Sequence, residues 1–502
     1  MKRATIAAAA LVLGLVLPFL GKPVHVDDAN FLRLAEGAAR DPWRPHAIEI
    51  NWLGVTEPAY AVLSNPPGVA WWLCPVRHAP EWVLHAWMLP WVALALLGIR
   101  RLGAALASDG LAAVLVLGAS PVVVLSAQAL TPDAPLLACV TLGVGGFLAA
   151  PRRAWPWALL AGCAGLFRYS GFCMVPLVLL AGFQTKRLRE ALPVAVAPLA
   201  LCLHDLHAYG SLHVLTMIGF QGVSFGPILV LRKAVAMLAM LGGAAMLPIL
   251  SWRRRAGPFL ALLGAVLGLF ASLSSGHTLA QMAPTVAFTA AGAVSLGAFR
   301  LRDATDRLLA AWFFGGLLFQ LVLQFAATRY WIPFLPALVV AVLRLRPSRR
   351  LLTAAVAASA LVSLGMAVDD DAFARALRDA ARRVAPLGPG VFAGHWGWQH
   401  YLEKEGWRPL EAGTEPRTVL AMSWATWPQA PAPDACLVQV EDRPLEYHGL
   451  GLRVHSAEGA ANYHSSGIAP PAGGRAIDTY APWTFSREPW DHVTIFRPCA
   501  AR

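Results

Sequence analysis

Long apolar stretches recur along the chain up to about residue 368, separated by short polar connections. A helix that crosses the hydrocarbon core of a membrane needs about 20 mostly apolar residues, or fewer where it is broken or tilted. The stretches that meet this criterion lie at 6–20, 81–99, 111–129, 133–150, 155–168, 169–184, 191–208, 227–250, 257–275, 282–298, 309–326, 330–345 and 351–368. The pattern predicts an α-helical polytopic membrane protein with about 13 transmembrane helices.

The pattern changes where Asp369, Asp370 and Asp371 begin a polar tail. We predict a transmembrane domain at 1–368 and a small α/β domain at 369–502. The tail alternates helical spacing with short β-like runs between turns rich in Pro and Gly. The expected helices are 372–384 and 396–405, and the expected strands are 391–393, 418–422, 436–440 and 492–496. The other long polar segment is the first loop, 21–80, in which an amphipathic helix is expected to lie along the membrane interface.

Composition supports the membrane class and excludes others. Hydrophobic residues make up 57% of the chain and charged residues 14%, against about 45–50% and 25% in an ordinary soluble protein. A set of soluble domains and a disordered chain are both excluded. A net charge of +12 would suggest a nucleic-acid partner if the protein were soluble.

The distribution of the basic residues indicates that the positive charge reflects membrane topology. Lys and Arg accumulate in cytoplasmic loops of membrane proteins, and here they gather in alternate connections. These residues are Arg100, Arg101, Arg152, Arg153, Lys186, Arg187, Arg189, Arg253, Arg254, Arg255, Arg300, Arg302, Arg307, Arg346, Arg349 and Arg350. The opposite connections at 130–132, 209–226 and 276–281 contain none, with Arg232 and Lys233 as the main exception. We therefore expect a bacterial cytoplasmic (inner) membrane protein with a cytoplasmic N-terminus, an extracytoplasmic tail and no nucleic-acid partner.

The cysteines divide between the two predicted domains. Cys436 and Cys499 both fall in the outer tail, where a single disulfide is expected in an oxidising compartment. Cysteines inside the apolar stretches are expected to pack as small hydrophobic residues. No cysteine spacing suggests a zinc site.

Three carboxylates lie where the predicted outer face meets the membrane. Asp27 and Asp28 follow the first span, and Asp133 begins the fourth. Ionisable groups at such positions cost several kcal/mol unless paired or hydrated, so they are candidates for function. The alternative is that they cap helices, although capping of the first helix needs only one of the two adjacent acids.

Two Arg-Tyr pairs interrupt apolar stretches at the same face. Arg168-Tyr169 stands where two short helices would meet, and Arg329-Tyr330 stands at the start of the twelfth span. A broken span places charge and hydrogen-bond donors at a cavity suited to an anionic ligand. Snorkelling of either Arg to the interface is the alternative.

Together these groups suit transfer of a group from a lipid phosphate. A carboxylate can act as general base on an acceptor hydroxyl, and guanidinium groups can stabilise the charge on a departing phosphate. A soluble nucleotide-sugar donor is disfavoured, because no Gly-rich phosphate-binding loop is present and the site faces away from the cytoplasm. The adjacent acids lack Asp-x-Asp spacing, so no cofactor is expected, and a divalent metal is possible but not required.

At these residues the chain resembles the GT-C glycosyltransferases of the protein O-mannosyltransferase and aminoarabinose-transferase type, glycosyltransferase family 39, over about residues 1–350. The family has a first-loop acidic pair, a Lys-Pro-Pro-Leu element, an acidic start to its fourth helix, a Lys-Tyr-x-Gly segment and a late Arg-Tyr-x-x-Pro element. The similar segments here are Val26-Asp27-Asp28-Ala29-Asn30-Phe31, Asn65-Pro66-Pro67-Gly68, Leu130-Thr131-Pro132-Asp133-Ala134-Pro135-Leu136, Phe167-Arg168-Tyr169-Ser170-Gly171 and Arg329-Tyr330-x-x-Pro333-x-x-Pro336. Five elements in the family's order at one predicted face make the resemblance fairly specific, and it implies a GT-C fold.

The resemblance also implies roles for individual residues. Asp27 would be the catalytic base, Asp28 and Asp133 would shape the acceptor site, and two basic groups would meet the donor phosphate. The expected phosphate-binding residues are Arg168, Tyr169, Arg329, Tyr330 and His277, and the expected substrate-loop residues are Asn65 and Glu57. Two positions depart from the family. Asn65 replaces a common Lys, so one phosphate or acceptor contact would be missing or would be supplied from elsewhere, for instance by His277. Asp28 replaces a Glu.

We therefore expect an inverting glycosyltransferase, either a hexosyl- or a pentosyltransferase, with a polyprenyl-phosphate sugar donor. Its acceptor would be a hydroxyl of a lipid, a cell-envelope glycan or a protein on the extracytoplasmic face. A multi-pass transporter or flippase for a lipid-linked or small polar substrate is the main alternative. A third is a non-catalytic membrane protein whose tail binds a partner.

Overall fold

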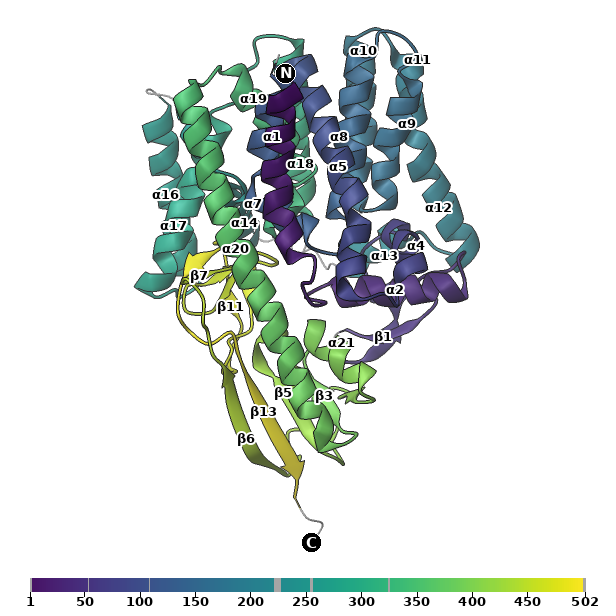
Figure 1. Cartoon of the computed structure of the whole chain (residues 1–502), viewed down its shortest axis with the longest axis vertical. Coiled ribbons are helices and arrows are strands. Elements are labelled where there is room, and N and C mark those ends of the chain that lie inside the picture. Colours follow the sequence, from purple (N-terminus) through teal and green to yellow (C-terminus); the bar gives the residue numbers. More distant parts are fainter. Residues whose placement is uncertain are drawn as a thin grey trace.

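The structure is a computed structural model that describes residues 2–52, 54–107, 109–220, 227–252, 256–323 and 326–499. A bundle of roughly aligned helices occupies one end of the molecule, and the C-terminal strands occupy the other (Figure 1). The N-terminus lies at the far end of the bundle from the C-terminus. The basic segment at 253–255 lies outside the described residues.

Helices occupy every apolar stretch that the sequence pattern singled out. They are α1 (Lys2–Val16), α5 (Glu81–Leu106), α6 (Gly110–Gly118), α7 (Pro121–Ala127), α8 (Asp133–Ala149), α9 (Trp155–Cys163), α10 (Met174–Gln184), α11 (Leu188–Ala191), α12 (Val196–Tyr209), α14 (Pro227–Ala244), α15 (Pro248–Ser251), α16 (Gly257–Ser274), α17 (Leu279–Leu296), α18 (Ala304–Leu321), α19 (Leu335–Arg344) and α20 (Arg349–Val384). Within the described ranges, 5 helical segments are long and apolar enough to cross a membrane, and the others are shorter.

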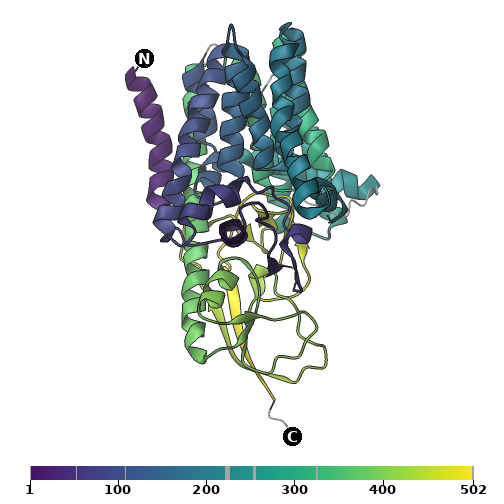
Figure 2. The same ribbon diagram turned by 90° about the vertical axis from the view of Figure 1, so that its right-hand side faces the viewer.

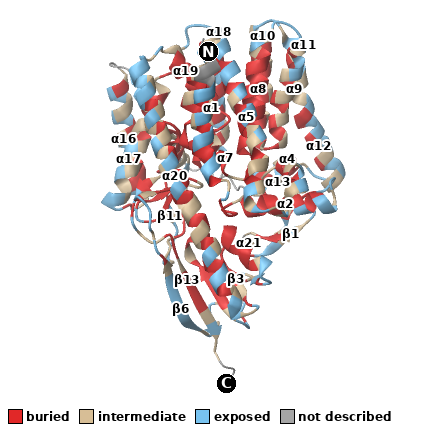
Figure 3. Ribbon diagram, in the orientation of Figure 1, coloured by how far each residue is buried: buried red, intermediate tan, exposed pale blue. Residues whose placement is uncertain are grey.

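The bundle buries small residues inside and leaves large apolar side chains outside. Gly98 of α5 lies so close to α8 that a Cβ there would be 2.3 Å from Thr141 Oγ1, so the two helices need glycine at this contact. On the outside, Leu203 of α12 and Phe259 of α16 are more than half exposed. Figure 3 shows exposed positions beside buried ones along the helices, and large apolar side chains occupy many of the exposed positions, as expected for a surface that faces lipid.

The first loop forms a small layer across one end of the bundle (Figures 1 and 2). It contains α2 (Asp28–Arg40), β1 (Glu49–Asn51), β2 (Thr56–Pro58), α3 (Ala59–Val62) and α4 (Gly68–Leu73), followed by α5, and a further short helix, α13 (His213–Phe220), packs against α3. Helix α2 buries one apolar face, which includes Phe31, Leu34 and Ala35. This arrangement agrees with the amphipathic helix expected in the first loop.

Helix α20 connects the bundle to the C-terminal region without a break. It continues through Asp369, Asp370 and Asp371 to Val384 and then runs beside the sheet (Figure 1). Helical spacing persists on both sides of the three acids, and no Pro or Gly interrupts the helix there, so the change to polar residues does not end it.

The C-terminal region contains a mixed sheet in the order β4-β3-β5-β13-β6. Its strands are β3 (Val391–Ala393), β4 (Arg408–Pro409), β5 (Leu420–Ser423), β6 (Leu437–Leu445) and β13 (Asp491–Pro498), and α21 (Trp396–Lys404) follows β3. Strand β3 pairs in parallel with β4 and β5, whereas β13 pairs antiparallel with β5 and β6. The four strands and two helices expected in this tail are present, and the expected disulfide joins Cys436 to Cys499.

Short strand pairs lie between the sheet and the bundle (Figure 1). They are built from β7 (Leu452–Arg453), β8 (His455–Ser456), β9 (Ala461–Asn462), β10 (Gly467–Ile468), β11 (Ile477–Asp478) and β12 (Thr484–Phe485). The sequence pattern did not predict these pairs, because two-residue strands carry no detectable alternation.

Candidate active site

The structure brings the three predicted acids together at the end of the bundle that faces the sheet. Asp27 is the residue before α2, Asp28 is the first residue of α2, and Asp133 is the first residue of α8. All three line one small polar cavity. The capping interpretation is wrong here, since neither helix start has a side-chain capping hydrogen bond.

Each predicted arginine forms an ion pair with one of these acids. Arg329 donates to the Asp27 carboxylate, and Arg168 donates to the Asp133 carboxylate. The side chain of Arg329 is 10% exposed and that of Arg168 is 14% exposed, so neither reaches out to an interface as snorkelling would require. The Tyr330 ring lies 4.5 Å from the Arg168 guanidinium carbon and 6.0 Å from that of Arg329.

Arg168 owes its position to a break in the helix. Helix α9 passes into a 3₁₀ turn at Ala164–Leu166, and another 3₁₀ helix begins at Tyr169. Between them Arg168 has an extended backbone, with φ −156° and ψ 143°. Arg329 similarly lies in a 3₁₀ turn, Thr328–Trp331. Arg168 therefore enters the site from extended backbone at a helix break, as the sequence indicated, and Arg329 enters it from a short 3₁₀ turn.

The two first-loop acids have opposite electrostatic environments. Burial raises the pKa of Asp27, but the charge and hydrogen bond of Arg329 outweigh burial and hold that pKa below its ordinary value. Burial raises the pKa of Asp28 to about 7, although Lys22 and the backbone N–H groups of Leu130 and His25 oppose the shift. Asp27 is therefore ionised at neutral pH, whereas Asp28 titrates near it.

Asp28 also has a clear structural contact. Its carboxylate accepts hydrogen bonds from the Leu130 N–H at 2.8 Å and from the His25 N–H at 3.3 Å. Leu130 stands just before α8, so Asp28 ties the first loop to the segment that carries Asp133.

The polar cavity has a volume of about 20 Å³, which is enough for about one water molecule or one hydroxyl group. The first loop, the start of α8, the Arg329 turn, α20 and the C-terminal region all contribute to it. Its polar lining consists of Lys22, His25, Asp27, Asp28, Ser126, Thr131, Asp133, Arg329, Asp370, Tyr463 and His464.

A larger, mainly apolar cavity of about 280 Å³ lies on the other side of Arg168. Arg168 lines this cavity and pairs with Asp133, which lines the polar cavity, so the pair links the two spaces. The apolar cavity is lined by Ser64, Asn65, Arg168, Tyr169, Ser170, Val214, Met217, Ile218, Phe319, Gln320, Val322, Leu323 and Tyr330. Asn65, Tyr169 and Tyr330 thus lie with Arg168, as expected from the sequence.

Two predicted site residues lie elsewhere among the described residues. His277 Nε2 is 2.9 Å from the backbone oxygen of Asp478, and its ring packs against Tyr480. Glu57 lies on β2, paired with Ile50 of β1. Neither residue lines either cavity. His277 binds the C-terminal region instead, so the contact expected from a Lys at position 65 is not supplied by His277.

Asp370 is the centre of a buried network that the sequence did not reveal. One carboxylate oxygen accepts from the Lys22 ammonium group, and the other faces the Nε2 atoms of His464 at 3.3 Å and His25 at 3.5 Å. The ligand atoms of His25, Asp370 and His464 lie within 4.8 Å of one another, which is close enough to be compared with a metal site. The Lys22 ammonium on the same carboxylate makes this arrangement a poor cation site, because like charges repel.

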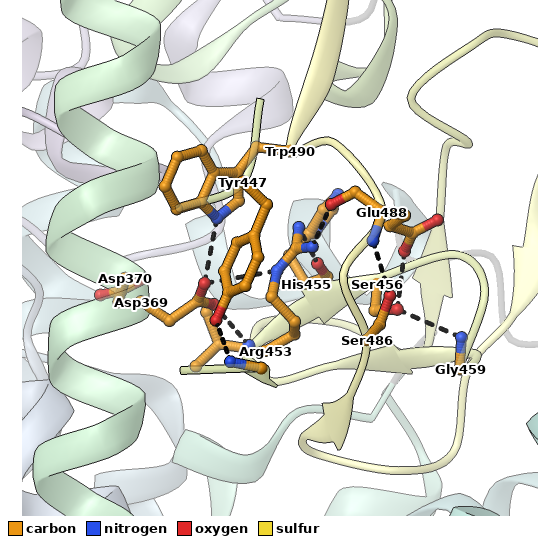
Figure 4. Close-up of polar contacts among 12 residues, drawn as sticks. Asp369, Asp370, Tyr447, Arg453, His455, Ser456, Gly459, Ser486, Glu488 and Trp490 are labelled. Atoms are coloured by element: carbon orange, nitrogen blue, oxygen red, sulfur yellow. Dashed lines mark hydrogen bonds and ion pairs between the residues drawn. The ribbon is translucent and has the colours of Figure 1, made fainter. Parts of the chain in front are cut away.

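The neighbouring acid, Asp369, anchors the C-terminal region to α20 (Figure 4). Its carboxylate accepts from Trp490 Nε1 at 3.0 Å and from the Val454 N–H at 2.8 Å, and it faces Arg453 Nε at 3.3 Å. Arg453 in turn donates to the backbone oxygens of Glu488 and His455. Consecutive acids of one helix therefore have different functions: Asp369 fixes the C-terminal region, and Asp370 faces the polar cavity.

Comparison with known proteins gives structural likeness at low similarity. No family model matches the chain, and no curated protein matches it by sequence. The chain is similar to ArnT from Cupriavidus metallidurans bound to undecaprenyl phosphate, with 14% identity, a TM-score of 0.42, and coverage of 83% of this chain and 92% of that one. For the apo state of ArnT from Cupriavidus metallidurans, the identity is 14% and the TM-score is 0.40, with coverage of 81% of this chain and 84% of that one. Arabinofuranosyltransferase AftD from Mycobacteria has 15% identity and a TM-score of 0.37; all of this chain is covered, but only 40% of AftD.

Proposed function

We propose that this protein is a membrane glycosyltransferase that moves a sugar from a polyprenyl-phosphate donor to an acceptor hydroxyl. The proposal includes a GT-C transmembrane domain of about 13 spans, with short and broken helices counted as spans, and an extracytoplasmic α/β domain beginning near Asp369. The membrane would be the bacterial inner membrane, with the N-terminus in the cytoplasm. The basic connections and the contribution of the C-terminal region to the polar cavity support this orientation.

One observation carries the proposal: the Arg168–Asp133 ion pair joins a mainly apolar cavity to a small polar one, and a second ion pair, Arg329–Asp27, lines the polar cavity. A polyprenyl phosphate has the same division, with an apolar chain at one end and a charged phosphate at the other. The chain would occupy the space beside Met217 and Leu323, and the phosphate would reach Arg168 and Arg329. Guanidinium groups suit phosphate because they form paired, charge-assisted hydrogen bonds.

The Arg329–Asp27 pair implies that the donor phosphate binds before Asp27 accepts a proton. While Arg329 holds Asp27, the carboxylate is a weak base because its pKa is lowered. A phosphate that binds Arg329 competes for the guanidinium and leaves the Asp27 oxygens free to accept a proton. The acceptor oxygen, losing its proton to Asp27, then forms a bond to the anomeric carbon. The bond from that carbon to the phosphate oxygen breaks, and the electron pair leaves with polyprenyl phosphate.

A direct test uses purified full-length protein with labelled polyprenyl-phosphate sugars and measures release of polyprenyl phosphate. The Asp27→Asn variant should bind the donor and lose at least about 100-fold in rate, the usual contribution of a general base. Asp41→Asn is the matched control, since Asp41 directly follows α2 and pairs with the exposed Arg44; it should keep wild-type activity.

Two results would contradict the proposal. Wild-type turnover by Asp27→Asn would remove the assigned base. Movement of the intact labelled lipid across reconstituted vesicles, with no consumption of the donor by the wild type, would support the transporter alternative instead.

A further inference from the structure

The C-terminal region contributes its own side chain to the polar cavity. His464 lines this cavity together with Asp27 and Arg329, although it follows them by more than a hundred residues. Its side chain is 15% exposed. A loop that only covers the bundle does not need an imidazole in a cavity lined by acidic residues, so the position of His464 suggests a further role.

The backbone around His464 is held firmly in place. The Tyr463 carbonyl accepts from the Thr328 N–H at 3.2 Å, and Thr328 directly precedes Arg329. The His464 N–H donates to Asn462 Oδ1 at 2.9 Å, while Asn462 donates to the Gly467 carbonyl at 2.8 Å. These contacts fix His464 relative to Arg329, independently of the sheet.

The side chain of His464 has the geometry of an oriented proton acceptor. Nε2 lies 3.3 Å from the Asp370 carboxylate, whereas Nδ1 is buried and has no hydrogen-bond partner among the described residues. A carboxylate on one ring nitrogen holds the proton there and leaves the lone pair on the other nitrogen. Lys22 on the second oxygen of Asp370 keeps that carboxylate ionised and in position.

A second base in the cavity would give the proton of the acceptor hydroxyl a route away from Asp27. A proton taken by Asp27 must leave again before the next cycle, and an imidazole is ordinarily a stronger base than a carboxylate by about 2–3 pKa units. An imidazole that lines the same cavity as Asp27 is therefore a suitable acceptor for this proton. The imidazolium that forms is stabilised by the Asp370 carboxylate.

We propose that His464, oriented by Asp370, is a second catalytic residue that accepts the proton released by the acceptor hydroxyl. The proton passes from the hydroxyl to Asp27, then to His464 Nδ1, and finally to water, so both groups return to their starting states. The C-terminal region thereby completes the active site. This inference rests on the proposed function and adds a specific residue to it.

The test compares His464→Ala with wild type in the donor-consumption assay, with and without added imidazole. The variant should lose about 100-fold in kcat with little change in KM for the donor, because Arg168 and Arg329 remain. Free imidazole should restore part of the lost rate by occupying the space of the missing ring. His492→Gln is the matched control on the same region, since His492 contacts Asp442 away from the cavity; it should behave as wild type.

Each other outcome has a definite meaning. Wild-type kcat in His464→Ala would overturn the role of His464 and leave the proposed function standing. A loss that imidazole does not restore would assign His464 a structural role, as would a lowered melting temperature in that variant. A stoichiometric divalent metal lost on substitution would also overturn proton acceptance, because the metal would occupy the ring nitrogen. A wild type that consumes no polyprenyl-phosphate sugar would overturn the proposed function itself.

Discussion

The two cavities at the end of the bundle differ in size, chemistry and origin. The larger one, about 280 Å³, is lined mainly by apolar side chains of the helical bundle. Most residues that line the smaller one, about 20 Å³, are of charged or polar types, and three of them, Asp370, Tyr463 and His464, come from α20 and the C-terminal region. Arg168 lines the apolar cavity and Arg329 lines the polar one, and each is paired with an acid of the polar cavity.

This difference suggests that one cavity binds the lipid chain and the other holds the reacting atoms. Apolar burial contributes about 25 cal/mol per Å² without directional preference, so the larger cavity suits a long isoprenoid chain. Charged hydrogen bonds are directional and strong when shielded from water, so the polar cavity suits the reacting atoms. The arginines would hold the phosphate between the isoprenoid chain in the apolar cavity and the reacting atoms in the polar cavity.

The largest effect on donor binding is expected from replacing the two arginines. Arg329→Gln and Arg168→Gln should each weaken donor binding about 10- to 100-fold, because each removes charged hydrogen bonds worth about 1.5–3 kcal/mol. The loss should be the same for donors of every chain length. Donor affinity, measured with labelled polyprenyl phosphates, checks this, and Arg44→Gln at an exposed ion pair is the control. Wild-type affinity in both variants would show that the phosphate lies elsewhere.

A smaller effect is expected from filling the apolar cavity. Met217→Trp should reduce affinity for long-chain donors by about tenfold, since each buried methylene group contributes about 0.8 kcal/mol. A donor with only two isoprene units should be much less affected. Leu203→Trp on the exposed face of α12 is the matched control. Equal losses of affinity for short and long donors would contradict the assignment of the isoprenoid chain to the apolar cavity.

A third effect, on stability rather than on donor binding, is a pH dependence that comes from the polar cavity. Burial raises the pKa of Asp28 to about 7 from an ordinary value of 3.8, so the folded state binds an extra proton between these values. Stability should therefore fall as pH rises from about 4 to about 7, by at most about 1.4 kcal/mol per pH unit from this group. Asp28→Asn should flatten that part of the profile of apparent melting temperature. An unchanged slope would show that Asp28 does not titrate in this window.

The sequence predicted the parts of the site that local patterns encode. Apolar stretches marked the helices, and charges at their ends marked Asp27, Asp133, Arg168 and Arg329. Asn65 could also be placed, because it lies in a short Pro-rich element of the first loop. These features are readable since each lies within a few residues of an apolar stretch.

The Asp370 network could not be predicted in the same way. Lys22 and Asp370 are separated by 348 positions and meet only after the chain folds. In the sequence, Asp369, Asp370 and Asp371 formed one polar boundary, yet helical periodicity directs them to different partners: Arg453, Lys22 and Arg375. His277 shows the reverse error, since its position in an outer connection suggested the site, whereas its hydrogen bond goes to Asp478.

The most direct test of the account is an experimental structure of the full-length protein with undecaprenyl phosphate. The account predicts that the phosphate lies within hydrogen-bond distance of Arg168 or Arg329. It also predicts that the isoprenoid chain passes between Met217 and Leu323, with Arg329 turned from Asp27 toward the phosphate. A lipid bound at another surface, with both Arg–Asp pairs intact, would contradict it.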